Sequence, residues 1–131
     1  MKSMKFQTTI LSLFILLFVK TATAQSFEGV WKGTALCQIK NSPCKDEIVV
    51  YRIKKNSSGT GYEMNAYKIV NGKEDYMGPL PFTYEDKQKV FVSIDSARND
   101  RWVFKVTGNT MKGTLHSNGD LYRIIDVKKE D

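Results

Sequence analysis

Apolar and polar residues alternate along most of this chain, and the clearest alternation begins at residue 27. One face of the strand predicted there is aromatic or small: Phe27, Gly29, Trp31, Gly33 and Ala35. Glu28, Lys32 and Thr34 fall on the other face, and this period of two is typical of a half-buried strand. Because Gly33 and Ala35 are small, we expect neighbouring side chains to lie over the Trp31 ring.

The same alternation recurs in further segments that short turns separate. It predicts strands over 48–53, 62–70, 80–85, 90–95, 102–106, 111–116 and 121–128. Asn71-Gly72 is the strongest hairpin signal, because both residues tolerate positive φ in a tight turn. Residues 75–79 are harder to place, and Pro79 and Pro81 favour a sheet edge or a loop over a barrel mouth.

No apolar run after residue 24 recurs at helical spacing over three turns. About eight strands joined by short hairpins predict an all-β fold, a single antiparallel up-and-down barrel, because closure removes exposed sheet edges.

The interior predicted for this barrel is apolar and aromatic with a few hydroxyl groups. Its members are the candidate ligand-binding residues Trp31, Tyr51, Met64, Phe82, Tyr84, Trp102 and Phe104, together with Met111. Such a lining suits a flat or acyl-chain ligand. The alternative is an interior without a pocket, because an eight-stranded barrel is only just wide enough for its own side chains to fill it.

The amino terminus has the pattern of an export signal. Lys2 and Lys5 precede an apolar run over 10–19, and Ala22-Thr23-Ala24 forms a small-x-small cleavage site. The run is shorter than the roughly 20 residues of a membrane-spanning helix. We therefore expect a signal peptide over 1–24 and one secreted or periplasmic domain over 25–131. We expect this domain to be a monomer with no membrane span after cleavage.

The charge balance argues against nucleic acid as a partner. Residues 1–24 hold three lysines and no acidic residue, so removing them lowers the formal net charge from +6 to +3. The remaining lysines are scattered among acidic residues, whereas nucleic-acid binding needs a concentrated basic face.

Cys37 and Cys44 flank a polar turn in a chain expected to be exported. This arrangement predicts one structural disulfide between them. A zinc or redox pair is the alternative, but zinc takes three or four ligands and the chain's one histidine, His116, lies on a different strand. We therefore expect no metal site.

The sequence offers no clear catalytic group. His116 falls on the face opposite Met111 and Leu115, so a nucleophile with a histidine base is not expected. The paired carboxylates all sit at predicted turns, where solvated acids are usual: Asp46-Glu47, Glu74-Asp75 and Glu85-Asp86. We expect a binding protein, not an enzyme, with no cofactor.

Two short motifs resemble the lipocalin-like, or calycin, superfamily. Gly29-Val30-Trp31 matches the Gly-x-Trp motif of that family's first strand, and Arg123 stands where its last strand supplies an arginine. The resemblance implies a barrel closed by Arg123 packed across Trp31. The alternative for Arg123 is a solvated arginine on the surface. The apolar lining described above, and not the resemblance, predicts a small hydrophobic ligand inside the barrel.

The chain is also similar to small exported bacterial β-barrel proteins with a cysteine pair. That resemblance implies no function. Small disulfide-pinned barrels of this size are, separately, known among bacterial lysozyme inhibitors. The alternative is a cell-envelope protein-binding module or enzyme inhibitor that presents the Cys37–Cys44 loop to a protein partner.

Overall fold

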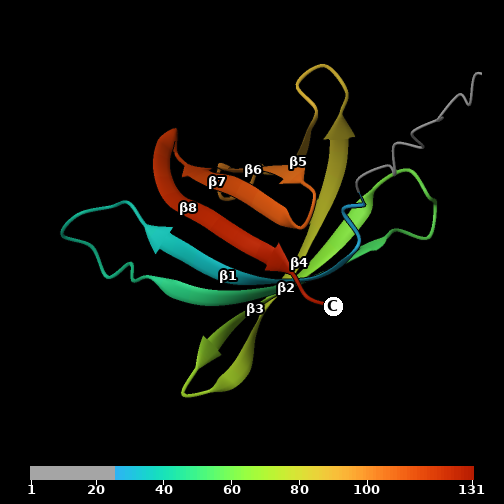
Figure 1. Cartoon of the computed structure of the whole chain (residues 1–131). Helices are drawn as coiled ribbons and strands as arrows, with labels where there is room; N and C mark the ends of the chain where they lie inside the picture. The colour runs from blue at the N-terminus through green and yellow to red at the C-terminus, as the bar shows by residue number, and fades with distance from the viewer. Residues whose placement is uncertain (1–25) are drawn as a thin grey trace, which may run out of the picture.

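A computed structural model describes residues 26–131 and contains one closed β-barrel (Figure 1). The predicted signal peptide, residues 1–24, lies outside this range. The strands are β1 (Gly29–Cys37), β2 (Glu47–Lys55), β3 (Tyr62–Val70), β4 (Lys73–Glu85), β5 (Val90–Asp95), β6 (Asp100–Thr107), β7 (Thr110–Ser117) and β8 (Asp120–Lys129). Each strand pairs antiparallel with the next, and β8 returns to β1. The all-β, single up-and-down barrel is confirmed.

The strand β4 is longer than the pattern predicts. It includes residues 75–79 and pairs with β3 from Lys73 to Phe82, whereas β5 covers only its last three residues, from Thr83. Pro79 and Pro81 therefore lie where β4 pairs with β3 but not with β5. On the unpaired edge, proline's missing N–H costs no hydrogen bond between strands. The short β4–β5 pairing makes this the least paired seam of the barrel wall.

Side chains from all round the barrel fill its interior. The largest residues with essentially no exposed surface are Trp31, Tyr51, Phe27, Phe82, Phe104, Met64 and Met111. Gly113 faces Phe104 across the sheet, and a β-carbon there would collide with that ring. The fit between ring and glycine indicates close packing.

Phe27 enters this core from outside the sheet. The predicted first strand starts at Phe27, but β1 starts at Gly29, whose φ of 130° turns the chain away from the strand direction. The Trp31 indole Nε1 donates a hydrogen bond of 3.0 Å to the Phe27 carbonyl oxygen. Phe27 thereby lies fully buried among the aromatic rings inside the barrel.

The closure between β1 and β8 differs from the expected one. Trp31 pairs with Lys129, whose Nζ lies 5.4 Å from the Trp31 ring centroid, whereas Arg123 pairs with Cys37 at the other end of β1. The prediction that Arg123 packs across Trp31 is therefore wrong. The physical reason is the register of the two antiparallel strands, because Cys37, the partner of Arg123, lies six positions along β1 from Trp31.

Gly33 also serves a different purpose from the one predicted. A β-carbon at Gly33 would meet the backbone of Asp126 and Val127 on β8. The small residue is needed for close approach of the β1 and β8 backbones, and not to admit a side chain over Trp31.

Arg123 instead ties three segments together at the end of the barrel that holds the β1–β2 loop. Its Nη1 donates to the carbonyl oxygens of Ala35 at 3.2 Å and Lys45 at 2.7 Å, and its Nη2 lies 3.4 Å from Glu47 Oε1. The predicted disulfide between Cys37 and Cys44 is confirmed and closes the same loop. This bond hints at an oxidising, extracytoplasmic environment.

No helix within residues 26–131 is long and apolar enough to cross a membrane.

Candidate ligand site at the barrel mouth

A cavity of about 750 Å³ opens at one end of the barrel. This end holds the β2–β3, β4–β5 and β6–β7 turns, opposite the end with the β1–β2 loop (Figure 1). The side chains that line the cavity are Tyr62, Tyr84, Lys89, Phe91, Lys105, Val106 and Thr107. We call this space the mouth cavity.

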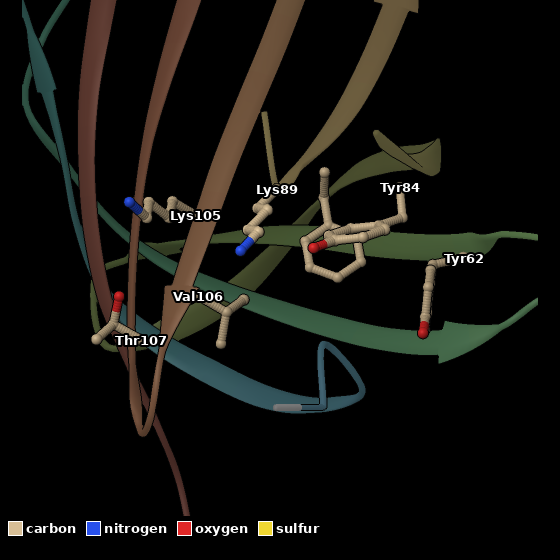
Figure 2. Close-up of a pocket in the computed structure, with 7 residues that line it drawn as sticks. Tyr62, Tyr84, Lys89, Lys105, Val106 and Thr107 are labelled. Atoms are coloured by element: carbon tan, nitrogen blue, oxygen red, sulfur yellow. The ribbon is translucent and has the colours of Figure 1, made fainter. Parts of the chain in front are cut away.

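The mouth cavity has an aromatic side and an aliphatic side. Figure 2 shows Tyr62 and Tyr84 on one side and Val106 and Thr107 on the other, with Lys89 between them. The opening exists because β6 continues to Thr107, beyond the β5 residues that pair with it, which begin at Phe91. The end of β6 stays paired with β7, but on the side of β5 it borders an open space.

Ring contacts continue from the mouth cavity into the core. The Tyr84 ring lies 4.9 Å from the Phe91 ring, and the Tyr62 ring meets Phe91 edge-on at 5.4 Å. Phe91 in turn stacks on Phe27 with centroids 3.9 Å apart and planes 7° from parallel. The aromatic side is therefore supported by a packed layer, which favours a preformed shape.

Tyr62 and Tyr84 differ in their contacts with this aromatic layer and in their exposure. Tyr62 is half-buried and contacts both Phe27 and Phe91, whereas Tyr84 contacts Phe91 and remains 46% exposed. A large aromatic ring exposed to this degree at a cavity rim offers apolar area that a ligand can cover.

Comparisons with protein-family models, with curated proteins and with solved structures found no match to this chain. The lipocalin-like assignment therefore stays a resemblance of the barrel in general and of the Gly29-Val30-Trp31 motif. The geometry of the mouth cavity is what supports a binding site there.

The seven predicted ligand-binding residues lie in different parts of the structure. Five of them are sealed in the core, with exposed fractions of 1% or less: Trp31, Tyr51, Met64, Phe82 and Phe104. Trp102 is half-buried and stacks on Phe104 with centroids 6.3 Å apart. Tyr84 alone of the seven lines the mouth cavity.

Burial also decides the chemistry of Tyr51. Burial raises the pKa of the Tyr51 phenol above its ordinary value, the Glu47 carboxylate adds to the rise, and Arg123 opposes it. Tyr51 therefore stays neutral and contributes packing in the barrel core.

Sequence reasoning missed most of the mouth cavity. Tyr62 could have been found, because it alternates in register with the interior residue Met64. The alternation places Phe91 on the face opposite Val90 and Val92, whereas in the structure all three are buried, so the faces of β5 could not be told apart by alternation. Lys89 lies in a turn, and nothing in the local sequence indicates that its side chain faces a cavity.

Residues 26–131 contain no group of three or more histidine, cysteine, aspartate or glutamate side chains placed to hold a metal ion. The mouth cavity offers apolar contact, two phenol groups, the Thr107 hydroxyl group and two ammonium groups.

Proposed function

We propose that this protein binds a small, flat, apolar molecule in the mouth cavity. The observation that supports this most strongly is an open cavity with an aromatic side directly above a filled barrel core. In this site the ligand would lie at the rim of the barrel, and not in the interior that the alternating pattern favours.

The volume and lining of the mouth cavity support this function. A space of about 750 Å³ falls within the range of small-molecule sites, roughly 300–1,000 Å³. Tyr62, Tyr84 and Phe91 supply flat apolar surfaces, and Val106 supplies an aliphatic one across from them. A flat molecule of about two fused rings has the right shape to cover Tyr84 and Phe91 together.

We further propose that the protein acts by binding and not by catalysis, as a monomer secreted or held in the periplasm. The disulfide supports a location outside the cytoplasm, because such bonds persist in oxidising compartments. The predicted signal peptide over 1–24 supports the same location.

A tyrosine substitution tests the site. With the neutral fluorescent probe N-phenylnaphthylamine, we expect Tyr84→Ala to weaken binding about tenfold, since one aromatic contact and its covered area are lost. Fluorescence titration measures the affinity. The matched control is Tyr76→Ala, because Tyr76 is also an exposed tyrosine, at 53%, but lies on the β3–β4 hairpin at the other end.

Tyr76→Ala should leave probe affinity within about twofold of the unmodified protein. Equal weakening by both variants would contradict the proposed site, as would the absence of probe binding to the unmodified protein.

The alternative function, a protein-binding module, is supported by a separate feature. The Cys37–Cys44 loop is closed by the disulfide and held at its base, where the Cys37 N–H donates to Asp46 Oδ1 at 2.8 Å and Arg123 donates to the Lys45 carbonyl. Gln38, Lys40 and Asn41 are exposed on it. A rigid exposed loop loses little entropy on binding, which suits recognition by a protein partner.

A further inference from the structure

We propose that the ligand of the mouth cavity is an anion, a flat apolar molecule with one carboxylate or sulfonate group that Lys89 binds. This inference rests on the proposed function and adds the charge of the ligand. Three observations support it: the backbone conformation of Lys89, the direction of its side chain, and the lack of an ion-pair partner for it among residues 26–131.

The backbone of Lys89 is unusual for a lysine. Five non-glycine residues within 26–131 have positive φ, and the other four are asparagines: Asn41, Asn71, Asn99 and Asn118. Asparagine tolerates this left-handed conformation better than most residues, whereas lysine, at a φ of 56°, gains no such advantage. A residue that costs backbone strain at a cavity suggests a use for its side chain.

The side chain of Lys89 extends across the opening. Figure 2 shows it between the tyrosine side and the β6 side, with its amine end directed toward Val106 and Lys105. Lys105 stands at the rim of the same cavity. Both ammonium groups therefore border an apolar space in which a bound ring would leave its polar substituent near Lys89.

Neither lysine is neutralised by a carboxylate of residues 26–131. Within residues 26–131, Lys54, Lys68 and Lys112 form ion pairs with acidic groups on neighbouring strands, but no carboxylate lies within 4.0 Å of Lys89 or Lys105. An unpaired ammonium beside an aromatic surface favours a ligand with an apolar body and a negative group over a neutral one.

Two probes with the same aromatic body test the charge. Anilinonaphthalene sulfonate is an anion, and N-phenylnaphthylamine lacks the sulfonate. The test variant is Lys89→Asn, which places at this turn the residue that the other left-handed positions use. The control is Lys87→Asn, because Lys87 is an exposed lysine of the same turn outside the cavity lining.

We expect Lys89→Asn to weaken the sulfonate probe about fivefold and to leave the neutral probe within about twofold, as one partly exposed charge pair would. The Lys89→Asn variant should resist denaturant at least as well as the unmodified protein, because asparagine relieves the backbone strain at this left-handed position. Lys87→Asn should change neither probe, and added salt should weaken the sulfonate probe alone.

The outcomes separate the two proposals. Failure of both probes to bind overturns the proposed function itself. Binding of both probes with no selective loss in Lys89→Asn overturns the anion inference and leaves the site standing. An equal loss in Lys87→Asn also overturns it, since the preference would then come from general positive charge.

Discussion

Replacing Phe27 with alanine is expected to lower the free energy of unfolding by about 3–5 kcal/mol, the range for removing a buried phenylalanine. Phe27 belongs to no strand, yet it is fully buried and contacts the rings of Tyr62, Phe82, Phe91 and Phe104. The hydrogen bond from Trp31 to its carbonyl oxygen holds the segment in place, so the barrel end cannot collapse freely into the space left. Denaturant unfolding followed by tryptophan fluorescence measures the loss.

Two further results distinguish a filled core from a loosely attached segment. Leu36→Ala removes a comparable apolar side chain from the exposed face of β1 and should change stability by no more than about 0.5 kcal/mol. Benzene should stabilise Phe27→Ala more than the unmodified protein, because it can occupy the new space. A loss below about 1 kcal/mol for Phe27→Ala would show that the segment before β1 is not part of the core.

Removing the disulfide has the second largest expected effect. The double variant Cys37→Ala with Cys44→Ala should lose about 2–3 kcal/mol, the amount that loop entropy assigns to a ring of this size. Probe affinity at the mouth cavity should stay within about twofold, because the loop lies at the other end of the barrel. Denaturant unfolding and the N-phenylnaphthylamine titration measure the two properties.

The same double variant helps to separate the two proposed functions. A protein partner that recognises the Cys37–Cys44 loop should bind the variant more weakly, whereas a small molecule in the mouth cavity should not. Reductant should destabilise the unmodified protein and leave the double variant unchanged. Two free thiols in the purified, unreduced protein would contradict the account of the loop.

The barrel itself could be predicted from the sequence because short segments of the chain specify its strands and turns. Alternation along each strand gives the face that turns inward, and the hairpin signals give the connections, of which Asn71 and Gly72, both with positive φ, are the clearest. The six residues Trp31, Tyr51, Met64, Phe82, Phe104 and Met111 were expected inside the barrel, and all are buried there. The close cysteine spacing likewise indicated the disulfide.

The closure and the mouth cavity could not be predicted, because both depend on how distant segments meet. The register between β1 and β8 decides that Lys129, and not Arg123, lies over Trp31. The cavity exists because β6 extends beyond its pairing with β5, which single-strand patterns do not specify. Lys89 lies in a turn whose backbone conformation places it at the opening.

The most direct test of the central claim is to locate a bound probe by methyl NMR. Val106 lines the mouth cavity, whereas Val49 and Ile125 are fully buried deeper in the barrel. We predict intermolecular contacts between N-phenylnaphthylamine and the Val106 methyl groups, and none with the methyl groups of Val49 and Ile125. Contacts with Val49 and Ile125 and none with Val106 would contradict the account, because the ligand would then occupy the barrel interior.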